Sequence, residues 1–580
     1  MLINMPEISS ERLIYRELEI EDSELIVSWR NTERLQSVSY QQKKITLEEH
    51  RRWFYDTRDR RIDIMFSDKE TNAPIGMISL EKNKYEGAPD KSFELNKFIG
   101  NISFLRKGLA FEATEAVLEY VLHILDIKFV FAVTRSDNHA NIRLNLRAGF
   151  EIQDVPDYLA HNSLEWVYMI LKSSSGYVWI IGGGVLQQPL IKEASELGYE
   201  IIVTDADPDC VCNDQASIFE PIDIFDFEAH IRFSDRLVSQ GITIEGVLAA
   251  GIDAPETMTR IAEHLGLPSV SSSIAHLVHN KDLFRQKMQE IGVPVPEFCV
   301  VTEGNLTHLD DIVSEVGYPL IVKNTCSSGS RGTRMFYAPD AKGIKETVDE
   351  AISVSRSNKA LIESLWNGSE HTVETLFDIN GKFHRCFITD RIFDKTEGFA
   401  LETGLIHPSR LSVEEQDAMY LLAEEVSNKL GVNQGAAKFD MFQTESGPRI
   451  IEMTVRLSGG FDCQYLVPAA TGKNILKAAL LTACGKTFSS DLLGDNKRRV
   501  AISESLWPPP GKIQDIDGLE VVREFEGYEY IYFRYNIGDY VGLYNDCTKR
   551  VCFIIVSGKN YLEAKENMSR IKNSIHVTVT

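Results

Sequence analysis

Two short apolar runs near residue 440 carry the feature that most restricts the fold of this chain. They are FDMFQ (439–443) and RIIEM (449–453), and the turn-forming sequence TESGP separates them. This pattern predicts a β-hairpin, and strand alternation then places Asp440 and Glu452 on one face. Two neighbouring carboxylates repel each other unless a cation lies between them. Mg²⁺ suits this position because carboxylates bind it together with phosphate oxygens.

Candidate phosphate-binding groups precede this hairpin. Lys281 begins a helical segment that stops at a Gly-Val-Pro sequence, and Lys323 ends the strand-like run YPLIVK. The sequence NTCSSGSRGT follows Lys323, and its glycines and serines allow backbone N–H groups to wrap around phosphate oxygens. Arg331 adds a cation to this loop. A lysine before such a loop is also typical of an ordinary hairpin, so this pattern alone leaves both interpretations open.

Two glutamates flank the next turn. Glu363 ends a strand-like run, and Glu370 follows a Gly-Ser turn ahead of an alternating apolar strand. They are either solvated carboxylates or partners for the ribose and adenine of a nucleotide. Arg456 begins the sequence Arg-Leu-Ser-Gly-Gly after the predicted hairpin, which places a guanidinium near the same end.

In this order, the segments VHNKD, YPLIVKNTCSSGSRGT, IESLWNGSEHTV and KFDMF…RIIEMTVRLSGG resemble the ATP-grasp superfamily, and most closely its carboxylate–amine ligases. The resemblance covers about residues 177–580 and implies an acyl-phosphate mechanism with ATP and Mg²⁺ (or Mn²⁺) as cofactors. It implies catalytic roles for Arg456, at the reacting carboxylate or acyl phosphate, and for Arg331. It implies nucleotide contacts, with Glu363 at the adenine and Glu370 at the ribose, for Lys281, Lys323, Ser327, Ser328, Gly329, Ser330, Gly332, Glu363, Leu365 and Glu370.

The metal segment departs from the family at one position. The resemblance implies that Asp440, Glu452 and Thr454 bind the metal, but the family carries an asparagine where Thr454 stands. A hydroxyl ligates Mg²⁺ less well than an amide carbonyl. The family's Lys-Pro is also replaced here, by Lys323-Asn324.

A small polar seam, residues 173–176 (Ser-Ser-Ser-Gly), separates two well-patterned regions. After it, YVWII, three glycines, a helical run and YEIIVTDAD predict a βαβ unit. The spacing of Gly182 and Gly184 also suggests an NAD fingerprint, but Gln187 stands in place of its third glycine. A Rossmann-like domain without nucleotide fits better.

The region before the seam contains Arg106-Lys107-Gly108-Leu109-Ala110 at the start of an amphipathic helix, where free amides and two cations suit a pyrophosphate. With SWRN, ITLEEHRRWF, APIGMISL and DNHANIRLNLRAGFE, it resembles the GNAT N-acetyltransferases, most closely the aminosugar acetyltransferases of the pseudaminic-acid pathway. The resemblance covers about residues 10–170. It implies that acetyl-CoA binds Arg106, Lys107, Gly108, Ala110 and Asn138, and that Glu94 is the general base.

That region departs from its family at two functional positions. Leu105 replaces the residue that opens the pyrophosphate loop, and Asn145 stands where many members carry a tyrosine general acid. The domain is therefore either catalytic or a degenerate CoA-binding or scaffold domain.

These resemblances imply an α/β and α+β multidomain chain, a GNAT fold followed by an ATP-grasp fold. The expected divisions are a GNAT domain (1–172), a linker (173–176), a Rossmann-like domain (177–275), an ATP-grasp domain (276–495) and a C-terminal closing domain (496–580).

Charge and composition exclude several classes of function. The net charge is −24, so nucleic acid is a poor partner. No run of residues resembles a membrane span or a secretory signal, and the nine cysteines form no paired framework, which favours a cytoplasmic location. A homodimer remains open.

The combined expectation is a bifunctional enzyme. Its ligase joins a small-molecule carboxylate to an amine, and its acyltransferase modifies an amine of a nucleotide-linked aminosugar or sugar acid for a surface glycan. The alternatives are an amino-acid ligase with a non-catalytic N-terminal domain and a carboxylase-type partner enzyme, which the lack of a biotin-carrier Met-Lys-Met motif disfavours.

Overall fold

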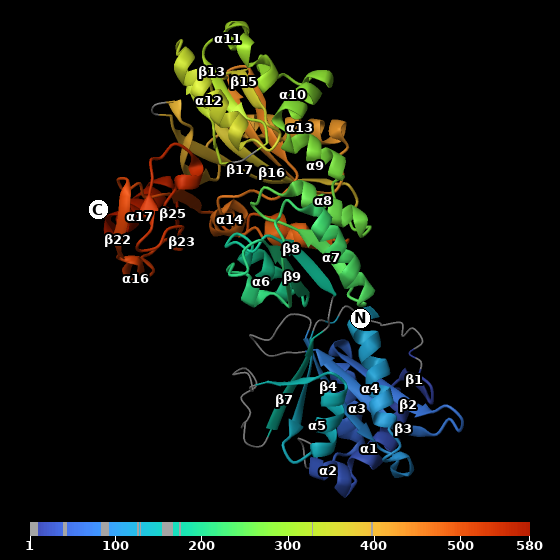
Figure 1. The fold of residues 1–580 in the computed structure, drawn as a ribbon. Helices are drawn as coiled ribbons and strands as arrows, with labels where there is room; N and C mark the ends of the chain where they lie inside the picture. Colours follow the sequence, from blue (N-terminus) through green and yellow to red (C-terminus); the bar gives the residue numbers. More distant parts are fainter. Residues whose placement is uncertain are drawn as a thin grey trace. The chain divides into compact units, whose positions relative to one another are not determined.

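The structure is a computed structural model, and it describes residues 8, 10–38, 43–82, 92–124, 127, 129–153, 166–172, 176–326, 329–395 and 398–580. The chain divides into two compact units, Met1–Ser175 and Gly176–Thr580 (Figure 1). Each unit has its own hydrophobic core. No helix among the described residues combines the length and the apolar character needed to cross a bilayer.

The first unit contains a seven-stranded sheet in the order β1-β2-β3-β4-β5-β7-β6. Its strands are β1 (Leu13–Glu17), β2 (Arg61–Asp68), β3 (Pro74–Lys82), β4 (Ser92–Ile99), β5 (Phe129–Arg135), β6 (Glu151–Gln153) and β7 (Trp166–Lys172). Its α-helices are α1 (Ser23–Arg30), α2 (Glu33–Val38), α3 (Leu47–Thr57), α4 (Leu109–Glu119) and α5 (His139–Arg147).

Helices cover both faces of this sheet, because apolar residues occupy consecutive positions of its central strands. In β2, Ile64 and Phe66 pack in the cluster that contains α4, whereas Met65 packs with Ile26 of α1 and Phe54 of α3. Strand alternation explains this division.

Among the described residues of this sheet, β4 and β5 are the one parallel pair, and they pair over only three residues, Ser92–Glu94 with Phe129–Phe131. Beyond that point β4 stays paired with β3 and β5 with β7. The two strands therefore diverge, and a wedge opens between them.

The second unit begins with a parallel four-stranded sheet in the order β10-β9-β8-β11. Its strands are β8 (Tyr177–Ile181), β9 (Glu200–Asp205), β10 (Ile218–Pro221) and β11 (Ile244–Leu248), and its helices are α6 (Gln188–Glu196), α7 (Phe227–Ser239) and α8 (Pro255–His264). This arrangement confirms the predicted βαβ pattern.

A small antiparallel sheet follows, in the order β12-β15-β13-β14, with α11 and α12 at the top of Figure 1. Its elements are β12 (Phe298–Val301), β13 (Leu320–Asn324), β14 (Arg334–Phe336), β15 (Ala360–Ser364), α11 (Leu309–Val316) and α12 (Ala341–Val354). Leu320, Val322 and Ile362 pack against these helices, so Lys323 and Glu363, at odd spacing from them, lie on the opposite face.

The largest sheet has eight strands in the order β20-β19-β16-β17-β18-β21-β25-β23. They are β16 (Ser369–Phe377), β17 (Phe383–Asp394), β18 (Leu401–His407), β19 (Gly435–Thr444), β20 (Gly447–Thr454), β21 (Val500–Glu504), β23 (Tyr528–Phe533) and β25 (Cys552–Gly558). The helices near it are α9 (Ser272–His279), α10 (Lys281–Glu290), α13 (Val413–Leu430), α14 (Val467–Thr471) and α15 (Ile475–Ala483).

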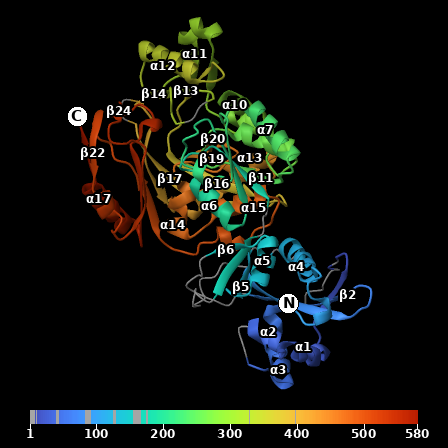
Figure 2. The same cartoon turned by 60° about the horizontal axis from the view of Figure 1, so that its bottom comes forward.

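The C-terminal segment continues this sheet. Strand β21 pairs with β18, β25 pairs with β21, and β23 pairs with β25 at the edge. Helix α17 (Tyr561–Ser574) packs on β21 and β25. It lies in the red part of Figure 2. A three-stranded sheet of β22 (Gly511–Asp517), β24 (Tyr540–Val541) and β26 (His576–Val579), with the short α16 (Leu519–Val522), completes the segment.

Candidate active site

The structure places Asp440 of β19 directly opposite Glu452 of β20, as partners in an antiparallel register. The turn between the strands is short, and a bulge after Asp440 interrupts the pairing. The two carboxylates that the sequence pattern assigns to one hairpin are therefore neighbours.

Positive groups surround the Asp440 carboxylate, which is buried. Oδ1 lies 3.0 Å from Nη1 of Arg391 and accepts a hydrogen bond from Thr372, and Oδ2 lies 2.5 Å from Nζ of Lys438. Burial alone would raise the pKa of Asp440, but these neighbours outweigh it and lower the pKa to about 2. Asp440 is therefore an ionised oxygen donor at neutral pH.

These residues fit a magnesium ion that is shared with phosphate groups. Asp440 and Glu452 offer hard, charged oxygen atoms, and Thr454 follows two residues after Glu452 on the same strand face. Among the described residues, no group of three His, Cys, Asp or Glu side chains could hold a metal by itself. Mg²⁺ usually takes one or two carboxylates and completes its shell with substrate oxygens and water.

Lys323 and Glu363 form a buried ion pair, a contact that the sequence does not reveal. Arg285 of α10 joins them, with its Nε 2.6 Å from Oε1 of Glu363. Burial acts to raise the pKa of Glu363, yet Arg285 and Lys323 together lower it to about 2. The carboxylate of Glu363 is thus engaged within the protein, and its adenine contact stays a prediction.

This trio carries one unbalanced positive charge in a buried place. Two cations, Arg285 and Lys323, share one carboxylate. Burial lowers the pKa of Lys323, and Glu363 acts in the opposite direction. A buried excess of positive charge favours an anionic ligand such as a phosphate group.

Lys281 and Arg285 connect α10 to the metal-site hairpin. Lys281 Nζ lies 3.8 Å from Oε2 of Glu452, and Arg285 donates a hydrogen bond of 2.6 Å to the carbonyl of Ile451. Arg285 is absent from the candidate site residues that the sequence patterns indicate. Its signal was the spacing of four residues from Lys281, which places both cations on one face of a helix.

The predicted phosphate loop is described from Gly329 onward, whereas Ser327 and Ser328 lie outside the described residues. Gly329, Ser330 and Gly332 all have positive φ angles, so the chain turns sharply here. The side-chain Nδ2 of Asn324 donates a hydrogen bond of 2.7 Å to the backbone carbonyl of Arg331.

The C-terminal segment contacts the same loop. The backbone N–H of Cys547 donates to the carbonyl of Gly329 at 3.0 Å, and Sγ of Cys547 lies 3.7 Å from Oγ of Ser330. The C-terminal segment therefore holds this loop in place.

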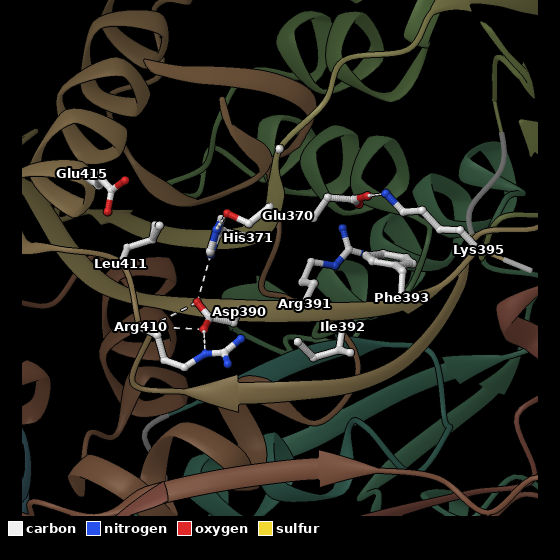
Figure 3. Close-up of a pocket in the computed structure, with 12 residues that line it drawn as sticks. Glu370, His371, Asp390, Arg391, Ile392, Phe393, Lys395, Arg410, Leu411 and Glu415 are labelled. Carbon is white, nitrogen blue, oxygen red and sulfur yellow. Dashed lines mark hydrogen bonds and ion pairs between the residues drawn. The ribbon is translucent and has the colours of Figure 1, made fainter. Parts of the chain in front are cut away.

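Glu370 lines a cavity of about 430 Å³ where β16 begins and the antiparallel β17 ends (Figure 3). Its Oε1 lies 2.9 Å from Nζ of Lys395, and this ammonium group also faces the rings of Phe393 and Phe442. A ribose hydroxyl could bind the same carboxylate. Leu365 is half-buried, and its backbone N–H already donates to the carbonyl of Pro319.

A second polar group borders this cavity. Figure 3 shows His371 extending toward Asp390, with Nδ1 3.0 Å from Oδ1, and Arg410 contacting the same carboxylate. Arg410, Ser409 and His371 together lower the pKa of Asp390 to about 2 against the effect of burial. These contacts fix the chain that leads into α13.

Arg456 lies in the turn after β20 and donates to the carbonyl of Leu457 at 2.8 Å. In the same turn, the N–H of Ser458 donates to Oε2 of Glu374 at 3.1 Å. Burial raises the pKa of Glu374 to about 7. Asp253, in the loop after β11 of the parallel sheet, lies 3.7 Å from Nδ1 of His279. His279, Arg456 and Lys281 lower the pKa of Asp253 against the effect of burial.

Side chains of the protein itself pack against the glycine turn that follows β8. Oδ2 of Asp205 accepts a hydrogen bond of 2.6 Å from the N–H of Gly183, and a Cβ on Gly183 would lie 2.2 Å from Sγ of Cys210. Gln187 makes two hydrogen bonds with the backbone of Ala250. Asp205, the acidic residue at the end of β9, is therefore bound by the backbone of this glycine turn.

In the first unit, Arg106, Lys107 and Gly108 form an exposed loop before α4, with positive φ at Arg106 and Gly108. Ala110 is the second residue of α4. Asn138 caps α5 through a hydrogen bond from the N–H of Asn141, so it has a structural role.

Glu94 is the last β4 residue that pairs with β5. The predicted base thus lies where the wedge opens, whereas Lys97, which no sequence pattern singles out, meets Asn145 farther along it.

Three family descriptions match separate parts of the chain. Residues 12–151 match the acetyltransferase (GNAT) domain, residues 280–490 match the carbamoyl-phosphate synthase L chain ATP binding domain, and residues 505–580 match the L-amino acid ligase C-terminal domain 2.

Curated relatives are distant. An uncharacterized protein of Sinorhizobium fredii, y4rH, is 24% identical over 65% of this chain and 78% of its own length. Human carnosine synthase 1 is 23% identical over 53% of this chain, and the Vibrio cholerae carbamoyl phosphate synthase large chain is 24% identical over 50%. The chain spans only 39% and 26% of those two proteins.

Solved structures show the same fold in the second unit. An L-amino acid ligase from Bacillus licheniformis matches 70% of this chain and 99% of its own, with a TM-score of 0.60 and 22% identity. The biotin carboxylase domain of the Hydrogenobacter thermophilus 2-oxoglutarate carboxylase matches 70% of this chain and 91% of its own, with a TM-score of 0.55 and 17% identity. The chain therefore combines a segment that matches the GNAT domain with a second unit that matches an ATP binding domain and a ligase C-terminal domain and shares the fold of these solved structures.

Proposed function

We propose that the second unit, residues 177–580, uses ATP and Mg²⁺ to activate a small-molecule carboxylate as an acyl phosphate, which an amine then converts to an amide. We further propose that the GNAT domain transfers an acetyl group from acetyl-CoA to an amine of an aminosugar or sugar acid, so that the two activities serve one surface-glycan precursor. The proposed divisions of the second unit remain 177–275, 276–495 and 496–580.

One observation carries the ligase proposal. The Asp440–Glu452 pair faces the cations of α10, because Lys281 contacts Glu452 and Arg285 contacts the neighbouring backbone at Ile451. Carboxylates for Mg²⁺ and cations for phosphate oxygens are thus combined in one place.

Each proposed residue has a definite task. Mg²⁺, bound at Asp440 and Glu452, would neutralise charge on the phosphate oxygens. Lys281 and Lys323 would bind those oxygens, and Arg456 would orient the reacting carboxylate. Glu370 would bind the ribose hydroxyls. The loop from Gly329 to Gly332 would cover the phosphates and exclude water.

The choice of an aminosugar rests on the resemblance of the N-terminal segments to aminosugar acetyltransferases. The choice of an amide product agrees with the L-amino acid ligase description matched by residues 505–580. The amine that the ligase joins to the carboxylate could also be a simple amino acid. The experiment below includes amino acids for this reason.

The deciding experiment incubates the full chain with ATP, Mg²⁺, acetyl-CoA and a panel of amino acids and aminosugar nucleotides, followed by mass spectrometry. We expect an amide product with release of ADP and phosphate, and an acetylated product with release of CoA. Release of AMP, or no ADP above background with any carboxylate, would contradict the ligase proposal. Binding of acetyl-CoA without acetylation of any amine would favour a non-catalytic N-terminal domain.

A further inference from the structure

Lys97 occupies an unusual position in the first unit. It lies on β4, three residues beyond the last pair between β4 and β5, and so in the wedge where the two strands diverge. Its Nζ donates a hydrogen bond of 2.5 Å to Oδ1 of Asn145 on α5. The lysine side chain therefore extends from β4 to the helix on the β5 side.

Asn145 is a fixed partner. Its side chain is fully buried, and its amide Nδ2 donates to Sδ of Met169 on β7 at 3.7 Å. That contact orients the carbonyl oxygen of Asn145 toward Lys97. Because the buried side-chain amide of Asn145 contacts both Met169 and Lys97, it fixes the position of the Lys97 amine.

We propose that the amine of Lys97 is the proton-transfer group of the acetyltransferase site, which relays a proton from the attacking amine to the departing CoA sulfur. This inference rests on the acetyl transfer proposed above. Glu94 lies on the opposite face of β4, because the two residues are an odd number of positions apart.

The chemistry needs one relay and balances without any other reactant. The neutral acceptor amine attacks the thioester carbonyl and forms a C–N bond, which gives an adduct with a positive nitrogen and a negative oxygen. Neutral Lys97 takes one proton from that nitrogen. The C–S bond then breaks, and Lys97 gives the proton to the thiolate, so the products are the amide and CoA thiol and Lys97 is neutral again.

Burial gives Lys97 a suitable proton affinity. It lowers the pKa of Lys97 to about 7, and no neighbouring charge contributes to this shift. A general base and acid works best when its pKa is near the operating pH, because both forms are then populated.

Charged groups on the surrounding elements have other partners or face solvent. Glu81 of β3 pairs with Arg60 and Arg61, Arg135 of β5 pairs with Asp137, and Glu112 of α4 pairs with Arg12. Arg147 of α5 lies over the ring of Phe111. Three further charged or titratable side chains are exposed: Glu115, His139 and Arg143.

The first test needs no turnover. The full chain is treated with trace acetic anhydride from pH 5 to pH 11, and the labelling of each lysine is measured by mass spectrometry, with exposed Lys69 as the internal control. We expect labelling of Lys97 to rise with an inflection near pH 7 and to fall at least about tenfold when CoA is added, whereas CoA should not change the labelling of Lys69. An inflection above pH 9, or no protection by CoA, would overturn the proposal.

The second test uses Lys97→Met, which removes the amine, and Lys97→Arg, which keeps a charge but cannot release its proton. With an acceptor that the wild type acetylates, we expect both variants to lose about 10²-fold or more in kcat with little change in the KM for acetyl-CoA. The wild-type rate should rise with pH through about 7.

Ligase activity, measured as ADP release, should stay unchanged in both variants and in the control Lys69→Met, which shows that the second unit is folded. An unchanged KM for acetyl-CoA in the variants shows that the first unit is folded as well. Acetyl transfer by Lys97→Met within threefold of wild type, with the same pH profile, would contradict the inference. If the wild type acetylates no amine, the proposed acetyl transfer fails by itself, while the labelling result still decides the proton affinity and location of Lys97.

Discussion

Nε of Arg285 lies 2.6 Å from Oε1 of Glu363, although the two residues are 78 positions apart and both side chains are buried. The same guanidinium donates to the carbonyl of Ile451 beside Glu452. One side chain thus links α10, the small antiparallel sheet and the hairpin of the metal site. Any relative displacement of these three elements would break a charged hydrogen bond.

Replacing Arg285 with methionine should destabilise the second unit strongly. The substitution leaves the buried Glu363 with Lys323 as its one remaining charged partner among the described residues, and breaking a buried ion pair from one side costs about 3–5 kcal/mol. Denaturant unfolding, followed by a probe in the second unit, measures this loss. The exposed Arg232→Met is the matched control and should change the free energy of unfolding by less than about 0.5 kcal/mol. A similarly small effect at Arg285 would disprove the linking role.

Glu363→Gln should alter the pH dependence of stability. The folded-state pKa of Glu363 is lowered from 4.5 to about 2, so its contribution is present above pH 4.5 and disappears as the pH falls toward 2. The difference in unfolding free energy between wild type and variant should therefore shrink by about 3 kcal/mol over that range. Urea titrations at several pH values measure it. A constant difference from pH 6 to pH 2.5 would contradict the assigned charge state.

Glu374→Gln should have the opposite dependence. Burial raises the pKa of Glu374 from 4.5 to about 7, so its carboxyl group favours the folded state when protonated, and this contribution is lost as the pH rises through 7. Glutamine keeps an acceptor for the N–H of Ser458 but cannot ionise. The variant should equal the wild type near pH 4 and exceed it by about 3 kcal/mol above pH 8. Glu425→Gln on the surface of α13 is the control, and a wild type that is more stable than Glu374→Gln at pH 8 would refute the prediction.

Arg106→Ala with Lys107→Ala should weaken acetyl-CoA binding. Both cations are exposed in the loop before α4, where they can reach a pyrophosphate. Loss of two hydrogen bonds to a charged group, at about 1.5–3 kcal/mol each, predicts a Kd at least about 10²-fold higher. Isothermal calorimetry with acetyl-CoA provides the measurement, and Lys69→Met is the control. Unchanged affinity in the double variant would place the CoA site elsewhere, whereas weaker binding without any acetylation by the wild type would favour a scaffold domain.

The sequence predicts the local parts of both sites better than the contacts between them. The hairpin with Asp440 and Glu452 is predictable because strand alternation and a short turn fix the relation of two nearby residues. The helix start at Gly108 and the βαβ unit after Tyr177 follow from equally local signals.

Partners that are distant in the sequence are not predictable from such patterns. Lys97 and Asn145 meet because β4 and β5 pair over only three residues, and no periodicity in the sequence encodes that divergence. Arg285 and Glu363 meet because two separate sheets approach α10. In both cases a polar group is acceptable in a buried position only through its partner, so each residue alone resembles a surface side chain.

Thr454→Asn should strengthen metal binding at the ligase site. Thr454 follows Glu452 by two residues on β20 and pairs with Lys438, so an amide at this position would face the same region as the two carboxylates. An amide carbonyl is a better ligand for Mg²⁺ than a hydroxyl group, and the concentration of Mg²⁺ that gives half-maximal ADP release should fall by about three- to tenfold.

Asp440→Asn should act in the other direction and reduce ADP release by about 10²-fold or more, since the ionised oxygen donor is lost. Thr444→Asn, in the turn of the same hairpin, is the control and should leave the Mg²⁺ requirement unchanged. An Mg²⁺ requirement in Thr454→Asn that equals the wild-type value would mean that this side chain does not approach the metal, and that Asp440 and Glu452 are the hairpin's only side-chain ligands.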